Sequence, residues 1–372
     1  FTCNNLNSMS FLKSTGKALG DVIPGLGRLT FDDNLGKIFV TSGTGVVGYR
    51  VAMSLLEQGQ KDVRVGVYKG EREAGTSAGA GESDFVDNIC RILEDKGAEV
   101  VDFDWTKEES QESALKGVKT VFCSLPHMDT SIDTFTHFLQ KCKGRKVEHF
   151  VKISFLHNDE YRNQVPFCKF HFQCDDLLEQ APKTSRISYT ILATSHLMTT
   201  PLLTQGEGLT KDHKHVTASY GMGIDYVSPN DVADAAMVVL LDRKAHRNKV
   251  YNLTARKPIT DRKVAQQLSE AYGTPIEHVE LGYHDYVDSM KARNVPSWVS
   301  RDAAAFEKMK ASGIDEDAHN YYPDLEQLIG RKPESFLDYL TNEKSQRPGK
   351  KFAPKPSDFE TVSKGGKPVE AQ

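Results

Sequence analysis

The sequence lacks the features that mark membrane-spanning and nucleic-acid-binding proteins. Its longest clean apolar stretch, Ala235–Leu241, falls far short of the roughly 18 residues that a transmembrane helix needs. Lys and Arg total 47 against 51 Asp and Glu, for a formal net charge of −4, whereas nucleic-acid binders usually carry a strong basic excess. With 372 residues and 38% hydrophobic residues, the chain can bury a sizeable core. We therefore expect a globular protein with no transmembrane segment and no nucleic-acid partner.

Cysteine is sparse and dispersed. The six cysteines form no C-x-x-C pair, so we expect free thiols in a reducing compartment rather than a disulfide framework. Cys168, His171 and Cys174 have a spacing that would suit a metal, but a structural zinc site normally draws a second ligand pair from elsewhere, and none is evident. We favour buried thiols and predict no metal site. His213 and His215 lie in a short polar stretch, for which we predict surface positions.

The two ends of the chain have few large apolar residues. The sequence begins with Phe1 rather than Met, and residues 1–30 contain one acidic residue among many Ser, Thr, Asn and Gly. This composition is typical of an organellar targeting segment or its remnant, with a flexible arm over residues 1–34 as the alternative. Phe1 resembles the residue exposed after cleavage of algal plastid presequences, which favours a plastid, with the cytoplasm otherwise. Residues 344–372 are rich in Lys, Pro, Gly and Ser and are predicted to be disordered.

Between the ends, short apolar strands alternate with helical patterns. This alternation predicts βαβ units, and hence a doubly wound α/β fold with a mostly parallel sheet and a small C-terminal substrate lobe. We place this domain at 35–312, its lobe mainly after 226, and a partly disordered extension at 313–372. The strands are expected at 37–41, 63–68, 99–103, 120–124, 149–154, 189–192 and 249–253, and the helices at 49–58, 87–96, 111–116, 130–143, 231–241, 261–272 and 283–293.

A glycine-rich segment follows the first strand. Its glycines match G-x-G-x-x-G and open a helix within a βαβ series, which is the context that dinucleotide binding requires. The first glycine permits the tight turn, the second lets the backbone approach a pyrophosphate, and the third lets the helix pack closely. The helix N-terminus then offers N–H groups to the phosphates. The predicted phosphate-binding residues are Gly43, Thr44, Gly45, Val46, Val47 and Gly48.

Other cofactor contacts are expected where the strands end. No Asp or Glu ends the second strand to bind a ribose 2′-hydroxyl; Lys69 and Arg72 follow it, and either could meet a 2′-phosphate. We favour NADP(H) over NAD(H), with two solvated loop charges as the alternative interpretation. Asp104 is placed to reach the adenine. The segment after the fourth strand, Ser124, Leu125 and Pro126, should face the nicotinamide.

Several segments resemble the NmrA-like branch of the atypical short-chain dehydrogenase/reductases, in family order over about residues 36–312. They are GTGVVG (43–48), AEVVDFDW (98–105), ALKGVKTVF (114–122), VEHFVKIS (147–154), ISYTIL (187–192), VSPNDVADAA (227–236) and KVYNLT (249–254). The resemblance implies a Rossmann domain with a small substrate lobe. It also implies one of two roles: an NAD(P)H-dependent reductase of quinones or related small molecules, or a dinucleotide-binding sensor without turnover.

Three departures from that family bear on catalysis. The Tyr-x-x-x-Lys pair of ordinary short-chain dehydrogenases is absent, the family's His-Phe-x-x-Lys becomes His171-Phe172-Gln173-Cys174-Asp175, and Ala193 replaces an arginine. The proton-donor candidates left are Ser154, His171, Lys169 and Lys152. Three functions therefore stay open: a reductase of quinone or enone-type molecules, a redox sensor or regulator, and a structural subunit of an organellar complex. The substrate and any protein partner are unknown.

Overall fold

The part of the chain that the structure describes excludes both ends and several loops. The structure is a computed structural model that describes residues 35–68, 83–125, 132–205, 209, 212–255, 257–292, 295, 297–314 and 321–342. The predicted N-terminal arm, the tail over 344–372, Lys69, Arg72 and Pro126 lie outside these residues. No helix in the described ranges has the length and apolar character needed to cross a bilayer.

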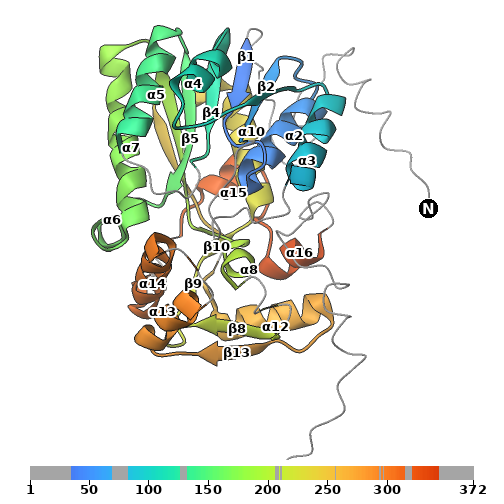
Figure 1. Ribbon diagram of the computed structural model, residues 1–372, viewed down its shortest axis with the longest axis vertical. Coiled ribbons are helices and arrows are strands. Elements are labelled where there is room, and N and C mark those ends of the chain that lie inside the picture. The colour runs from blue at the N-terminus through green and yellow to red at the C-terminus, as the bar shows by residue number, and fades with distance from the viewer. Residues whose placement is uncertain are drawn as a thin grey trace, which may run out of the picture.

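A seven-stranded parallel sheet organises the larger part of the molecule (Figure 1). Its order, β11-β6-β5-β4-β1-β2-β3, reverses between β1 and β4, as in a doubly wound nucleotide-binding sheet. Ligands in such sheets bind beyond the carboxyl ends of the strands at this point. The strands are β1 (Lys37–Val40), β2 (Val63–Val67), β3 (Glu99–Asp102), β4 (Val118–Cys123), β5 (His149–Phe155), β6 (Ser188–Thr194) and β11 (Lys249–Leu253).

Helices cover both faces of the sheet, because the strands present apolar side chains to either side. One core lies under the first group of helices and includes Val40, Leu55 and Val239. The other contains the edge-to-face rings of Phe103, Trp105 and Phe138. The first group is α2 (Val46–Glu57), α3 (Ser83–Asp95), α10 (Pro229–Leu241) and α15 (Asp324–Ile329), and the second is α4 (Glu108–Ala114), α5 (Ile132–Gly144) and α7 (Pro166–Thr184).

A smaller lobe lies at the carboxyl edge of the sheet (Figure 1). Three small pairings build it: β8 with β13, β9 with β12, and β7 with β10. The helix α14 joins it to the sheet domain, since Met309 packs with Tyr161 and Phe172. The lobe and its connections comprise β7 (His196–Leu197), α8 (Thr200–Gln205), β8 (Lys214–Thr217), β9 (Gly223–Ile224), β10 (Tyr226–Val227), β12 (Ile259–Thr260), α12 (Asp261–Tyr272), β13 (Glu277–Glu280), α13 (Tyr283–Ala292), α14 (Ser297–Ala311) and α16 (Phe336–Thr341), and two short helices, α6 (Asp159–Gln164) and α11 (Arg243–His246), flank the sheet.

The predicted fold class is confirmed, and the predicted strands appear with small shifts of their ends. The lobe was expected mainly after residue 226. Its strand β8 lies before that residue, whereas α10 and β11 lie after it and belong to the sheet domain. Among the described residues of the predicted extension after 312, the structure has two helices, α15 and α16. Of these, α15 packs on α10, and α16 places Phe336 and Tyr339 in the core of the lobe.

Candidate functional site

The glycine-rich loop connects β1 to α2 at the switch point of the sheet. A Cβ on Gly43 would collide with the Val65 side chain of β2, and one on Gly48 would collide with the carbonyl oxygen of Ser42. These two glycines are therefore required for the close approach of β2 and α2 to the loop. A Cβ on Gly45 would meet only Ser42, with its carbonyl oxygen at 3.1 Å, and the Gly45 backbone is extended (φ −72°, ψ 159°).

The start of α2 has the character of an anion site. The N-cap residue, Gly45, has no side chain to cap this helix, and the first turn contains no acidic residue, so no carboxylate there opposes an anion at the positive end of the helix dipole. At Gly45, bare backbone forms the wall of the loop where a larger residue would place a side chain. The residues present thus fit a dinucleotide, and the placement of its pyrophosphate at Gly43 to Gly48 stays a prediction.

Hydrogen bonds fix this loop to the end of β4. The hydroxyl of Ser42 donates to the carbonyl oxygen of Ser124 at 2.7 Å, and the Ser124 N–H donates to the Thr41 hydroxyl at 3.2 Å. The loop and the segment beginning at Ser124 and Leu125 therefore form one edge. This agrees with the predicted nicotinamide side, which stays a prediction.

Asp104 is largely engaged within its own loop. Its carboxylate accepts hydrogen bonds from the N–H and the hydroxyl of Thr106, at 2.8 and 2.7 Å, and lies 3.4 Å from the Lys107 ammonium. Burial works to raise the pKa of Asp104, but these partners outweigh it and hold the pKa below its ordinary value. The predicted contact of Asp104 with the adenine stays a prediction.

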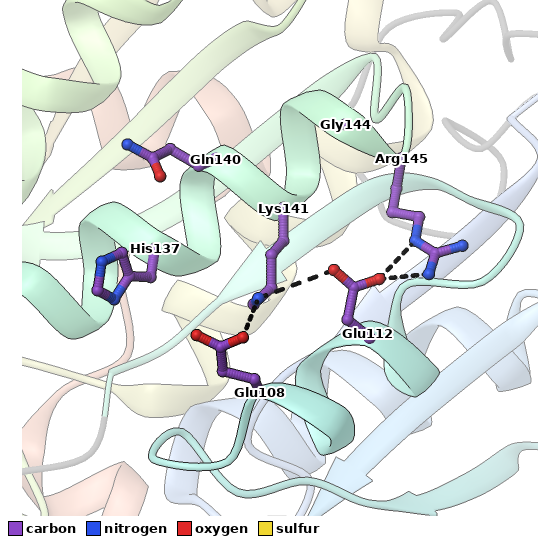
Figure 2. A pocket seen from close by; sticks show the side chains of 7 residues that line it. All are labelled: Glu108, Glu112, His137, Gln140, Lys141, Gly144 and Arg145. Carbon is purple, nitrogen blue, oxygen red and sulfur yellow. Dashed lines mark hydrogen bonds and ion pairs between the residues drawn. The ribbon is translucent and has the colours of Figure 1, made fainter.

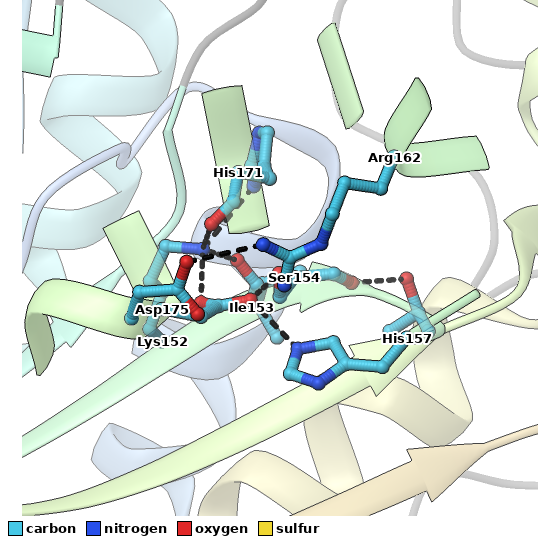
Figure 3. Close-up of polar contacts among 9 residues, drawn as sticks. Lys152, Ile153, Ser154, His157, Arg162, His171 and Asp175 are labelled. Carbon is cyan, nitrogen blue, oxygen red and sulfur yellow. Dashed lines mark hydrogen bonds and ion pairs between the residues drawn. The ribbon is translucent and has the colours of Figure 1, made fainter. Parts of the chain in front are cut away.

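A buried polar cluster lies between β5 and α7 (Figure 3). Lys152 and Ser154, two residues apart on β5, both point toward Asp175 on α7. The Lys152 Nζ lies 2.8 Å from Asp175 Oδ1 and 3.3 Å from the Nδ1 of His171. The Ser154 hydroxyl donates to Asp175 Oδ2, and the Nε2 of His157 lies 3.0 Å from the same oxygen.

In this cluster the Asp175 carboxylate, at the position where the resemblance implies a lysine, is paired with the Lys152 ammonium. The side chains of Lys152 and Asp175 are 0% and 1% exposed. Burial alone would raise the pKa of Asp175; the Lys152 ammonium, together with hydrogen bonds from His157, Lys152 and Ser154, holds it below the ordinary value. Lys152 thus supplies from the strand a positive charge next to the helix position where the resemblance leads us to expect one.

The candidate proton donors occupy different places. Ser154 lies near the carboxyl end of β5, two residues beyond the pairing of Lys152 with Cys123, the last residue of β4. His171 joins the cluster but packs among the rings of Phe155 and Phe167, at centroid distances of 5.2 and 4.6 Å. Lys169 is exposed on α7 and does not belong to the cluster.

Two members of the cluster were missed as functional candidates. The sequence motifs mark Asp175 as the position of a lost lysine and as a neighbour of the Cys168, His171 and Cys174 spacing, and they give His157 no role. The sequence does hold one signal for Asp175. A carboxylate on the buried face of a helix requires a cationic partner, and Lys152 is a lysine within an otherwise apolar strand. His157 follows the strand at a position that no motif marks.

The cysteines near the cluster are inert core groups. Cys168 and Cys174 are both fully buried, but they pack in different clusters of side chains. Burial raises the pKa of the Cys174 thiol to about 12. Within the described ranges, no group of three or more His, Cys, Asp or Glu side chains is placed to hold a metal ion.

A second buried cluster of charged side chains lies in the small lobe, and the predicted surface position of His215 is wrong. This residue is not at the surface: it is 1% exposed, because it lies within β8 with its ring turned inward. Its Nε2 lies 3.2 Å from Asp261 Oδ1, and Lys310 Nζ lies 2.6 Å from Asp261 Oδ2. Burial acts to raise the pKa of Asp261, but His215 and Lys310 hold it well below its ordinary value. The cluster joins β8, α12 and α14.

The outer surface of α4 and α5 carries a hollow of about 470 Å³ (Figure 2). Its charged side chains are paired with one another: Lys141 lies 3.3 Å from Glu108, and Arg145 pairs with Glu112. These four charged side chains are paired with one another across the hollow, and we assign it no function.

The comparisons with known proteins agree with this geometry. The model of the NmrA-like family matches residues 35–343. The chain is similar to the prestalk A differentiation protein A of Dictyostelium discoideum, at 24% identity over 81% of this chain and 90% of that protein. It is also similar to an uncharacterized oxidoreductase, YesF, of Bacillus subtilis, at 22% identity over 81% and 93%.

Solved structures share the fold. The Citrobacter sp. triphenylmethane reductase complexed with NADP(H) superposes with a TM-score of 0.65 at 22% identity, covering 82% of this chain and 98% of that one. The Escherichia coli NADPH-dependent quinone oxidoreductase complexed with NADPH gives a TM-score of 0.65 at 19% identity, with the same coverage. At these identities the likeness shows the fold alone.

Proposed function

This chain belongs to the NmrA-like family of NAD(P)-binding proteins, and on that premise we propose that it is an NADPH-dependent reductase of small quinone or enone-type molecules. The observation that carries the proposal is the arrangement of two groups at one edge of the sheet. The predicted dinucleotide loop follows β1, and near the carboxyl end of β5 the Ser154 hydroxyl donates a hydrogen bond to the Asp175 carboxylate.

The cofactor would supply a hydride, and the chain must supply the rest. Gly43 to Gly48 would hold the pyrophosphate, and the segment beginning at Ser124 would lie beside the nicotinamide. The preference for NADP(H) rests on Lys69 and Arg72, whose charges suit a 2′-phosphate. Two relatives in the fold comparison bind this cofactor according to their descriptions, which supports the proposal without deciding it.

Ser154 is the proton donor that the cluster favours. A reduced quinone or enone develops negative charge on its oxygen and needs a proton there. Among the predicted donors, His171 is enclosed by rings, Lys152 is bound to Asp175, and Lys169 lies elsewhere. Ser154 combines a place at the carboxyl edge with a hydrogen bond to a group that can exchange protons.

The test is a pair of measurements on the purified chain. Calorimetric titration with NADPH and with NADH should show tighter binding of NADPH. Oxidation of NADPH, followed by its near-ultraviolet absorbance, should require menadione or cyclohexenone and disappear in Gly45→Val. Gly144→Ala is the matched control, because a Cβ at Gly144 meets nothing within 4 Å.

A redox sensor without turnover is the second candidate. Its support is the complete enclosure of the Lys152 ammonium, which also contacts the backbone oxygens of Ile153 and His171 at 3.3 and 3.4 Å. NADPH binding without oxidation by any acceptor would favour this function. Failure to bind either dinucleotide would favour the third possibility, a structural subunit of an organellar complex.

A further inference from the structure

We propose that Asp175 and His157 form a proton relay that connects Ser154 to solvent. The inference rests on the proposed reductase function and identifies the source of its proton. A serine hydroxyl is by itself a weak acid, so a reductase that relies on Ser154 needs a group that restores its proton quickly. The structure offers one route for this.

The two oxygens of Asp175 have different partners. Oδ1 lies 2.8 Å from the Lys152 ammonium, which compensates its charge within the core. Oδ2 contacts both the Ser154 hydroxyl and the Nε2 of His157, the latter at 3.0 Å. One carboxylate oxygen therefore joins the Ser154 hydroxyl, near the carboxyl end of β5, to the imidazole of His157.

The outer end of this chain reaches water. Ser154 is 1% exposed and Asp175 is 0% exposed, but the side chain of His157 is 34% exposed. The ring of His157 also packs edge-on against Phe172, at a centroid distance of 5.1 Å. The imidazole is thus held in position on one side and hydrated on the other, as a group that exchanges protons with solvent requires.

The charges around His157 come from three elements. Asp175 lies on α7, with Lys152 of β5 behind it. Arg162 of α6 lies 5.1 Å from the centre of the Phe172 ring and is paired with Asp176 of α7 at 3.1 Å. Asp159 and Glu160 begin α6, directly after the loop that holds His157. Asp175 is the carboxylate in contact with the imidazole.

The proton balance of the relay is closed. When hydride reaches the acceptor, the acceptor oxygen takes the proton of Ser154 Oγ. Ser154 regains a proton from Asp175 Oδ2, Asp175 takes it from His157 Nε2, and His157 takes one from water. Each turnover consumes one hydride and one solvent proton, and Asp175 returns to the carboxylate that Lys152 stabilises.

The kinetic test compares His157→Gln and His157→Ala with His137→Gln, the last being an exposed histidine on α5 outside the cluster. With menadione and NADPH, both His157 variants should lose roughly 10- to 100-fold in kcat, with an unchanged KM for NADPH. The pH dependence of kcat should flatten. Added imidazole should restore His157→Ala, and His137→Gln should behave as the unchanged protein does.

A second measurement needs no cofactor. In the free protein labelled with ¹⁵N-histidine, the Nε2 resonance of His157 should move in Asp175→Asn and stay in place in His137→Gln. A wild-type rate and pH profile in His157→Gln, with no rescue of His157→Ala, would overturn the relay while leaving the reductase in place. A wild-type chain that oxidises no NADPH with either acceptor would overturn the reductase and the relay together.

Discussion

At the scale of single residues, the glycines of the dinucleotide loop have separable roles. Gly45 has a backbone conformation open to any residue, and a Cβ there meets only Ser42. Gly48 has no such space. We expect Gly45→Val to keep the fold and to weaken NADPH binding by about 100-fold or more, because its side chain fills the pyrophosphate site. Gly48→Ala should instead destabilise the loop itself.

Calorimetry and thermal unfolding separate the two effects. Gly45→Val should unfold within a few degrees of the original protein, as Gly144→Ala should, while only the former loses the dinucleotide. Wild-type affinity in Gly45→Val would show that the phosphates lie elsewhere.

The pairing of Lys152 with Asp175 makes a second prediction at this scale. Removing one partner leaves a buried charge without compensation, so Lys152→Met should lower the free energy of unfolding by about 3 kcal/mol. The double variant Lys152→Met with Asp175→Leu should be more stable than Lys152→Met alone, since it removes both charges. Chemical denaturation of the original protein, of Lys152→Met, of Asp175→Leu and of the double variant measures this double-mutant cycle. Additive losses would mean that the two side chains do not interact.

At the scale of elements, ion pairs of one arginine, Arg331, connect the segment after residue 321 to α10. Arg331 lies 2.6 Å from both Asp231 and Asp234 on α10. The Asp231 side chain is 0% exposed, so its charge depends on this partner.

We expect Arg331→Ala to cost about 2 kcal/mol of stability, because Asp231 is left buried without its counter-ion. Lys291→Ala is the matched control: Lys291 and Asp288 form an ion pair whose side chains are 66% and 70% exposed, and its loss should leave the free energy of unfolding nearly unchanged. Urea denaturation compares them. Equal small losses would show that α15 is held by its apolar contacts alone.

The same elements show how far the sequence could predict the molecule. Strands of the main sheet are continuous apolar runs between turns, so the sequence predicted their positions along the chain and a mostly parallel sheet. The paired two-residue strands β7 and β10 have no periodicity of their own, and they form only because the lobe folds over the sheet edge. His215 was misplaced for a related reason: its burial depends on Asp261 and Lys310, which lie far away in the sequence.

In the candidate site too, features formed by neighbouring residues could be predicted, and features formed by residues distant in the sequence could not. The glycine loop is local, and its spacing alone predicted where a dinucleotide would lie. The cluster of Lys152, Asp175 and His157 joins a strand, a helix and a loop, so the sequence revealed only that a lysine was missing from α7. What replaces it became visible once β5 and α7 were side by side.

At the scale of the whole molecule, buried carboxylates and buried histidines together set the response to acid. The folded-state pKa values of Asp175 and Asp261 both lie below their ordinary value near 4. Their contributions to stability are therefore complete above that ordinary value and are lost as pH falls through the lower folded-state values. Burial lowers the pKa of His149 and of His196 to about 3 in the folded protein, so these histidines remove stability as pH falls below about 6.5, where only the unfolded chain takes up their protons. Burial also raises the pKa of Asp231 to about 6, which offsets part of this loss. We expect the free energy of unfolding to fall from about pH 6.5 downward and more steeply below about pH 4, where Asp175 and Asp261 lose their contributions.

Denaturation midpoints measured over a series of pH values test this. Asp175→Asn should be less stable than the original protein at neutral pH but should lose less stability on acidification. A parallel loss in both proteins would assign the acid sensitivity to other groups.

Binding of the dinucleotide should stabilise the entire fold, because the loop joins β1, β2, β4 and α2 at the centre of the sheet. A ligand at about 100 times its Kd adds roughly 2.7 kcal/mol to the free energy of unfolding, which for a chain of this size raises Tm by about 5 °C. NADPH should produce this rise and NADH a smaller one at the same concentration. Replacing Lys69 and Arg72 together by Gln should bring the two cofactors to the same shift, because the 2′-phosphate then loses its cations. A difference that persists in this double variant would place the selection for the phosphate on other residues.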